Sequence, residues 1–164
     1  MDGLQLPSIR TAVPGPASQA WIDRLAQREC PAITARRARR ASSLGRAEDD
    51  PIVWKEAVGS NIMDVDGNIY VDLTAGFGVA GAGHRNASIA EAGKRQLGVL
   101  LHAMGDAFPD PTRIELMESL CMQAGMDRAI LGSSGSDAVE AALKTAKMAT
   151  GRPGVLAFHQ GYHG

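Results

Sequence analysis

The chain has 164 residues, of which 45% are apolar and 21% charged, and its formal net charge is −1. These values are typical of a soluble globular protein with one ordinary domain, and they give no general attraction for nucleic acid or an anionic membrane surface. No stretch approaches the ~20 apolar residues of a membrane span, and the N-terminus lacks the apolar core of a signal peptide. The chain has only two cysteines, Cys30 and Cys121, which cannot form a disulfide framework. A reducing, cytoplasmic setting is therefore expected.

Residues 1–50 are rich in Pro, Ala, Arg and Ser. We expect one helix there, beginning near Ser18 with Trp21 and Leu25 on one side, and loop elsewhere. A basic run and an acidic run follow each other and are interpreted as a solvated linker: Arg36, Arg37, Arg39, Arg40 and Arg46, then Glu48, Asp49 and Asp50. A nucleic-acid or targeting role is the alternative, but the basic run lacks interleaved aromatic residues.

A small antiparallel sheet is predicted for residues 51–84. Short strands are expected at 52–58 and within 61–72, with a turn at Asp66-Gly67-Asn68. The segment from Asp64 to Asn68 has a superficial likeness to a calcium-binding loop. An EF-hand requires glycine at its sixth position and glutamate at its twelfth, and Gly67 is too early, so a hairpin turn is predicted instead.

A glycine-rich connection, residues 74–84, follows the sheet. Its segment from Gly76 to Gly81 matches the G-x-G-x-x-G pattern of dinucleotide-binding proteins. That pattern requires a helix to open at its last glycine, and Ala82-Gly83-His84 is poor helix sequence. Because the strand before it is also expected to be antiparallel, the dinucleotide interpretation is disfavoured, and His84 is interpreted as shaping a tight loop.

Two helices are predicted between residues 85 and 125. The first begins near Ser88. The second has Thr112-x-x-Glu115 as a capping box and Gly125 as its stop.

The remaining residues suggest strands alternating with helices. After a short apolar run at 129–131, residues 138–149 are Ala-rich and predicted to be helical, with Gly151 as the stop, and 155–158 is predicted to be a buried strand. The alternation from residue 85 onward favours an α/β domain with a parallel sheet.

The segment Ser133-Ser134-Gly135-Ser136, ahead of the Ala-rich helix, is the most informative candidate site. A helix start has unpaired N–H groups and a positive dipole end, small residues let an anion approach them, and hydroxyls add donors, so a phosphate site is predicted. The segment is not a Walker A loop, because no Gly-Lys-Ser/Thr follows. An ordinary capped helix, with Ser134-x-x-Asp137 as capping box, is the alternative.

A metal site is not predicted. The histidines form no H-E-x-x-H motif and no cluster with the cysteines; they are His84, His102, His159 and His163.

Four stretches together resemble class III pyridoxal-phosphate aminotransferases, the family of 4-aminobutyrate and ornithine aminotransferases. They are residues 64–72, 76–84, 134–144 and 149–164, and their order and spacing make the likeness specific over roughly 51–164. The resemblance implies an α/β fold, an incomplete fold-type I transferase. It divides into an N-terminal extension with one helix and a basic linker (1–50), a small antiparallel sheet segment (51–84) and the truncated start of the cofactor-binding large domain (85–164).

The resemblance implies pyridoxal 5'-phosphate as cofactor. The Gly135 N–H and the Ser136 hydroxyl would bind its phosphate, with Ser134 beside them. Tyr162, which by residue type alone is a core or rim aromatic, would stack on the pyridine ring, with His163 next to it.

The implied activity is transfer of an amino group from a small-molecule donor to a keto acid by a cytoplasmic homodimer that binds neither nucleic acid nor membrane. Phe77 would line the substrate pocket. The family's Schiff-base lysine would lie past Gly164, so no catalytic residue is assigned and the chain alone is expected to be inactive. Lys144 is a poor substitute, because it lies about two turns, or ~12 Å, beyond the phosphate.

Two departures from the family pattern occur: Asp137 stands where glutamate is usual, and Asn86-Ala87 where His-Pro is common. Neither removes an implied cofactor contact. A non-catalytic interaction module, or an aminomutase or decarboxylase of the same family, is the alternative function.

Overall fold

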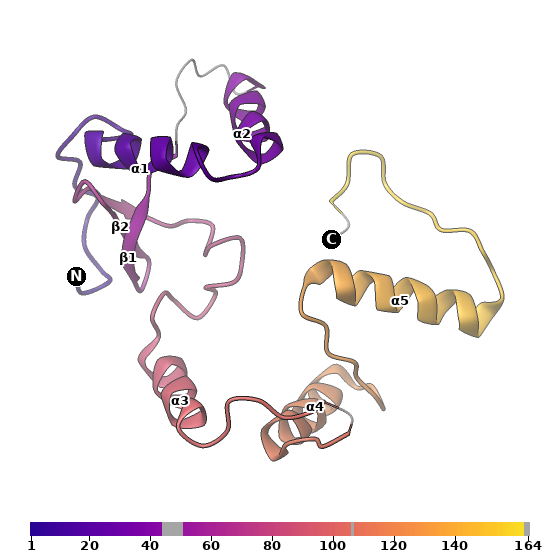
Figure 1. Ribbon diagram of the computed structural model, residues 1–164. Coiled ribbons are helices and arrows are strands. Elements are labelled where there is room, and N and C mark those ends of the chain that lie inside the picture. Colours follow the sequence, from indigo (N-terminus) through magenta and orange to yellow (C-terminus); the bar gives the residue numbers. More distant parts are fainter. Residues whose placement is uncertain (44–50, 106, 163–164) are drawn as a thin grey trace. The chain divides into compact units, whose positions relative to one another are not determined.

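The computed structural model describes residues 1–43, 51–105 and 107–162 (Figure 1). The chain forms two compact units, Met1–Val99 and Leu100–Gly164. Among the described residues, the first contains a three-stranded sheet and three helices, and the second contains two helices. No helix in the described ranges combines the length and the apolar character needed to cross a membrane.

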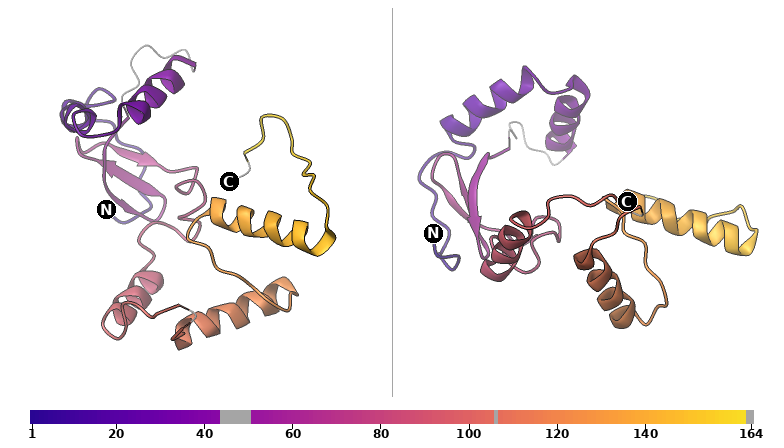
Figure 2. Two further views of the ribbon diagram at one scale, coloured as in Figure 1. Left: turned by 45° about the vertical axis from the view of Figure 1, so that its right-hand side comes forward. Right: turned by 60° about the horizontal axis from the view of Figure 1, so that its bottom comes forward.

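The sheet of the first unit is antiparallel, as predicted. It comprises β1 (Trp54–Val58), β2 (Asn61–Asp64) and β3 (Ile69–Val71) in the order β1-β2-β3. Val58 lies opposite Asn61 in the first pair, and Met63 lies opposite Ile69 in the second. Figure 2 shows the paired strands from two further directions.

A buried carboxylate closes the turn between β2 and β3. Asp64 is fully buried. Its Oδ1 accepts the backbone N–H groups of Asp66 and Asn68 at 2.9 and 2.8 Å, and its Oδ2 accepts the Asn68 amide and the Tyr70 hydroxyl, each at 2.8 Å. Burial, followed by the hydrogen bond to Asp64, raises the pKa of Tyr70 to about 12. The predicted hairpin turn is therefore confirmed, with Asp64 as its internal acceptor.

The N-terminal segment lies on this hairpin through side-chain amides. Asn61 accepts the N–H of Gln5 at 2.8 Å and donates to the Gln5 carbonyl at 2.9 Å. Asn68 Oδ1 accepts the N–H groups of Arg10 and Thr11 at 2.7 and 3.1 Å. Because Asn61 and Asn68 are both almost fully buried, these bonds satisfy polar groups that would otherwise be costly inside the unit.

The first helix, α1 (Pro16–Ala26), is capped by the hairpin instead of by its own sequence. The Asp66 carboxylate accepts the N–H groups of Ala17 and Ser18 at 2.7 and 2.8 Å and the Ser18 hydroxyl at 2.6 Å. A Cβ on Gly15 would lie 2.3 Å from Asp66 Cγ, so only glycine permits this approach. Burial raises the pKa of Asp66, but the hydrogen bonds from Ser18 and Ala17 outweigh burial and hold it below its ordinary value.

A second helix, α2 (Pro31–Ser43), forms where the sequence analysis expected loop. Alanine and arginine both have high helix propensity, and Pro31 is suited to the first helical position, so the basic run is compatible with a helix. Glu29 accepts hydrogen bonds from Thr34 and Arg37, and the Arg37 bond lowers the pKa of Glu29. Arg46 and the acidic run lie outside the described residues.

The third helix, α3 (Ala87–Leu97), begins close to the predicted Ser88. Asn86 caps it, since its side-chain oxygen accepts the N–H groups of Ser88 and Ile89 at 3.1 and 3.3 Å. The departure of this chain from the common His-Pro pattern therefore supplies a strong helix N-cap.

The second unit contains α4 (Pro111–Ala124) and α5 (Gly135–Thr150). Both helices end as predicted, at Gly125 and Gly151, whose φ angles are +63° and +68°. The predicted cap of α4 is wrong. Asp110, not Thr112, caps this helix by accepting the N–H of Arg113 at 3.0 Å, because Pro111 occupies the first helical position.

The strand predicted at 155–158 does not form. These residues have no regular structure, and the Leu156 side chain is fully exposed. A parallel strand requires a hydrogen-bonded neighbouring strand, and the described part of the chain contains no strand that pairs with residues 155–158. The only sheet in the described ranges is the antiparallel one, so the expected parallel sheet is absent from them.

Candidate functional site

The helix start predicted to bind phosphate is present at α5. Ser134 is the extended N-cap residue, and its hydroxyl oxygen accepts the N–H of Asp137 at 3.1 Å. Within the described ranges, the N–H groups of Gly135 and Ser136 and the Ser136 hydroxyl have no hydrogen-bond partner. Ser134 therefore caps the helix, as the alternative interpretation proposed, and the next two residues still offer three donors.

The loop before α5 is held tightly against the first turn. A Cβ on Gly132 would lie 3.0 Å from Asp137 Cβ and 3.3 Å from the Ala138 nitrogen, whereas a Cβ on Gly135 would meet nothing within 4 Å. Glycine at 132 thus allows the close turn, and the space beside Gly135 is open. Gly132 was not among the predicted site residues, although its position directly before the serine segment was the available signal.

Asp137 fixes this loop and does not complete a reciprocal capping box. Its Oδ2 accepts the Ser133 hydroxyl at 2.5 Å and the Ser133 N–H at 3.3 Å. The hydroxyl bond is the main cause that lowers the pKa of Asp137. The carboxylate that replaces the family's glutamate is thus ionised and engaged with Ser133 next to the three free donors.

Of the two residues expected at the cofactor ring, the structure describes only Tyr162. Tyr162 is 94% exposed and follows the segment that forms no strand, so its stacking role stays a prediction. His163 lies outside the described residues.

Phe77, expected in the substrate pocket, lies on a constrained loop of the first unit. Its side chain is 86% exposed, and its φ of +59° is unusual for a residue other than glycine. No helix opens at Gly81, and α3 begins only at Ala87. The dinucleotide interpretation is therefore excluded for this loop.

The base of that loop is closed by Asp72, which the sequence analysis did not identify as a site residue. Its carboxylate accepts the N–H and hydroxyl of Thr74 at 2.9 and 2.7 Å and the N–H of Gly76 at 2.8 Å, and it lies 2.8 Å from His84 Nε2. The hydrogen bond with His84, followed by that with Thr74, holds the pKa of Asp72 well below its usual range. The prediction that His84 shapes a tight loop is confirmed.

Lysines near the two candidate regions lie on solvent-exposed helix faces. Lys144 of α5 is paired with Glu140 at 3.1 Å, and Lys94 of α3 is paired with Glu91 at 3.7 Å. Among the described residues, no three His, Cys, Asp or Glu side chains are grouped so that they could hold a metal ion.

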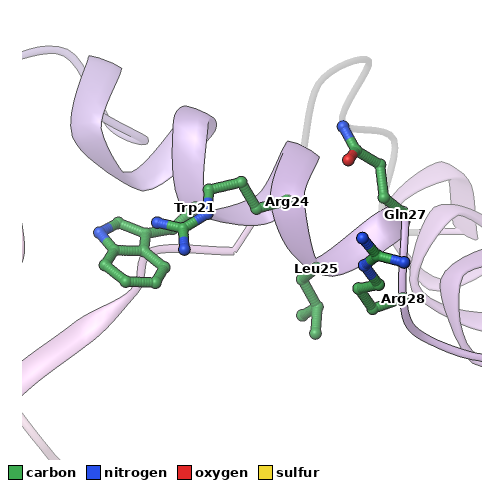
Figure 3. A pocket seen from close by; sticks show the side chains of 5 residues that line it. All are labelled: Trp21, Arg24, Leu25, Gln27 and Arg28. Carbon is green, nitrogen blue, oxygen red and sulfur yellow. The ribbon is translucent and has the colours of Figure 1, made fainter.

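A separate shallow pocket lies on α1 and the residues that follow it (Figure 3). The Arg24 guanidinium carbon lies 4.2 Å from the centre of the Trp21 ring, with Leu25, Gln27 and Arg28 completing the lining. All five residues come from one stretch of chain, and none of the sequence-predicted site residues belongs to this pocket.

Comparison with known proteins relates the chain to one enzyme family. The family model for class III aminotransferases matches residues 44–164. The chain is 36% identical over 132 residues to 5-aminovalerate aminotransferase DavT of Pseudomonas aeruginosa, covering 79% of this chain and 31% of that protein. It is 41% identical over 113 residues to acetylornithine aminotransferase of Archaeoglobus fulgidus, covering 69% and 30%.

A solved structure supports the same relation. A glutamate-1-semialdehyde aminomutase of Pseudomonas aeruginosa, in complex with PMP, matches with a TM-score of 0.63 and 31% identity, over 70% of this chain and 24% of that one. The chain spans about a third of the length of the curated relatives it matches. Its fold is part of the fold-type I architecture of pyridoxal-phosphate enzymes, and the chain belongs to the class III aminotransferase family.

Proposed function

We propose that the protein acts as a pyridoxal-phosphate-dependent aminotransferase and that this chain supplies the helix that binds the cofactor phosphate. The observation that carries the proposal is the start of α5. There, the N–H groups of Gly135 and Ser136 and the Ser136 hydroxyl have no partner in the part of the chain that the structure describes, and the space beside Gly135 is open. Three donors at the positive end of a helix fit a phosphate group.

The proposal assigns roles to residues of this chain. Gly135 and Ser136 bind the phosphate, and Ser134 fixes the helix start that orients them. Tyr162 packs on the cofactor ring with His163 beside it, and Phe77 lines the substrate pocket. When bound, the cofactor supplies the electron sink for moving an amino group between a donor and a keto acid. None of the chain's own lysines is assigned a catalytic role.

In the proposed enzyme, the chain consists of three segments and belongs to a homodimer in the cytoplasm. Residues 1–50 are an extension, 51–84 a small-sheet segment, and 85–164 the beginning of the cofactor-binding domain. A homodimer is supported by the helices α3, α4 and α5, which bury none of their residues and leave apolar side chains uncovered. A reducing cytoplasm is supported by the two unpaired cysteines, Cys30 and Cys121.

An aminomutase is the second candidate function, because a solved aminomutase matches this chain with 31% identity. The two reactions differ in their need for an acceptor. An aminomutase returns the amino group to the carbon skeleton of its own substrate, whereas an aminotransferase delivers it to a separate keto acid. Turnover that requires an added keto acid supports the aminotransferase, and turnover without one supports the aminomutase.

Cofactor binding to the purified chain tests the phosphate site directly. We expect pyridoxal phosphate to bind with a Kd of about 1 mM, the scale of ~4 kcal/mol, and Ser136→Ala to raise that Kd about tenfold by removing a donor to a charged group. Pyridoxal without its phosphate serves as the ligand control. Ser119→Ala on α4 is the matched serine control, because its hydroxyl accepts an exposed hydrogen bond from Gln123 one turn along the same helix. Equal Kd values for the two serine variants would show that the phosphate does not bind at Ser136.

A further inference from the structure

The loop between β3 and α3 is closed at its base by a single carboxylate. The side chains of Asp72 and His84 are 4% and 16% exposed, although the loop between them is open to solvent. Asp72 receives two donors from Thr74 and one from Gly76, so it fixes the first part of the loop. Its contact with His84 Nε2, at 2.8 Å, joins the residues on either side of the loop.

Both ends of the loop are also tied to the turn between β1 and β2. His84 and Gly59 exchange two backbone hydrogen bonds, at 2.8 and 2.9 Å, and the Asp72 N–H donates to the Ser60 carbonyl at 2.8 Å. The Trp54 ring meets the His84 ring edge to face, with centroids 5.9 Å apart. The Asp72–His84 pair is therefore anchored to the sheet, and its place does not depend on the loop that it closes.

Between these ends, the backbone is held in a conformation that residues other than glycine avoid. The φ angles of Ala75 and Phe77 are +50° and +59°. Such residues persist only where the surrounding structure fixes them, and they are enriched at functional sites. Within the loop the N–H of Gly78 donates to the Thr74 carbonyl at 3.0 Å, and that of Ala80 donates to the Ala75 carbonyl at 2.8 Å.

A constrained backbone here carries apolar side chains that the first unit does not cover. Leu73, Phe77 and Val79 are 91%, 86% and 92% exposed. The far part of the loop borders a hollow against α3, which is lined by Val79, His84 and Ile89 among others. The loop thus presents an apolar surface from a fixed base.

We propose that Asp72 and His84 are positioning residues that hold the 73–83 loop in one conformation and thereby set where Phe77 meets the substrate. The proposal rests on the aminotransferase function for its consequence, since Phe77 lines the substrate pocket only in such an enzyme. The pair acts through the loop and does not touch substrate or cofactor. Loss of either partner releases the loop while the hairpin beneath it stays folded.

Amide hydrogen exchange of the full chain, followed by NMR, tests the positioning. In Asp72→Ala and His84→Ala we expect exchange at Gly78, Ala80 and Gly83 to rise at least about tenfold, while the hairpin amides of Asp64 and Ile69 stay unchanged.

His84→Gln retains a side-chain N–H donor and should restore exchange to within about threefold of the wild type. Asp127→Ala, at an exposed aspartate in the second unit, is the control. A change confined to the Gly76 amide, which bonds Asp72 directly, would overturn the proposal.

Kinetics of the holoenzyme test the consequence for substrate. Phe77→Ala and His84→Ala should each raise KM for the amino donor about tenfold and leave kcat within about twofold, because Phe77 touches substrate and not the reacting atoms. His84→Ala added to Phe77→Ala should raise KM no further, since both act on one contact. Fully additive effects on KM would overturn the assignment. Absence of turnover in a cofactor-loaded enzyme that includes the Schiff-base lysine would refute the proposed function alone, because the exchange pattern decides the loop positioning independently.

Discussion

The hairpin region of the first unit and the helices of the second are stabilised in different ways. In the hairpin region, buried polar side chains join segments far apart in the sequence, as when Asp66 caps α1 from 48 and 49 residues away. In the second unit each helix end is fixed by residues next to it, and α4 and α5 bury no residue. Apolar side chains such as Met148 and Phe158 remain 86% and 87% exposed there.

The difference shows that helix ends and tertiary packing have separate causes. Neighbouring caps and left-handed glycines define α4 and α5 without any burial. Residues 155–158 can form a strand only beside partner strands, and the described residues contain no strand that pairs with them. In the hairpin, by contrast, the polar partners of Asp64 and Asp66 all lie within Met1–Val99, so these long-range bonds form inside one unit.

The largest expected effect comes from removing the acceptor at the centre of the hairpin. Asp64→Ala deletes four hydrogen bonds and removes the acceptor of the Tyr70 hydroxyl and of the Asp66 and Asn68 backbone N–H groups. We expect a loss of about 3 kcal/mol in the free energy of unfolding of the first unit, measured by urea unfolding with tryptophan fluorescence. Asp23→Ala, at an exposed position on α1, should change it by less than ~0.5 kcal/mol.

A loss below about 1 kcal/mol for Asp64→Ala would contradict the importance of the long-range polar bonds. The first unit would then be held mainly by its few buried apolar residues, Ile22 and Ile62, and the contrast between the two regions would disappear.

Acid should weaken the capping of α1. The pKa of Asp66 is held below its ordinary value of 3.8, so its cap contributes fully above that value. The contribution declines as the pH falls through 3.8 and is lost below the folded-state pKa. Trp21, on α1, reports the weakening by fluorescence in a Trp54→Phe background. Asp66→Asn, which lacks the charge at every pH, should abolish this acid step, and a step that persists would show that another carboxylate controls α1.

The sequence predicted the elements whose signals are local. The stops at Gly125 and Gly151 could be identified because glycine favours the left-handed conformation that ends a helix. At the start of α4 two local signals competed, and Pro111 selected Asp110 over Thr112. The basic run of α2 was interpreted from its charge, although its alanines and arginines favour a helix.

The long-range features could not be predicted from the sequence. No local pattern indicates that Asp66 caps α1, or that Asp72 pairs with His84 across 12 residues. At the candidate phosphate site, the helix start and the Ser134 cap were foreseen because they are local. The position of Tyr162 relative to Gly135 depends on strands that lie side by side in a parallel sheet. The described residues of the second unit form no such strands.

The smallest effect is expected at the cap of α5, where stabilisation is local. Ser134→Ala removes the acceptor for the Asp137 N–H and should cost about 1 kcal/mol of helix stability. Because α5 buries no residue, the loss should appear as about fivefold faster exchange at Asp137 and Ala138, with the hairpin amides unaffected. Ser136→Ala should leave this exchange nearly unchanged, since its hydroxyl is not a cap. Faster exchange at Ile69 as well would show that the second unit supports the first, and the separation between locally and distantly stabilised regions would fail.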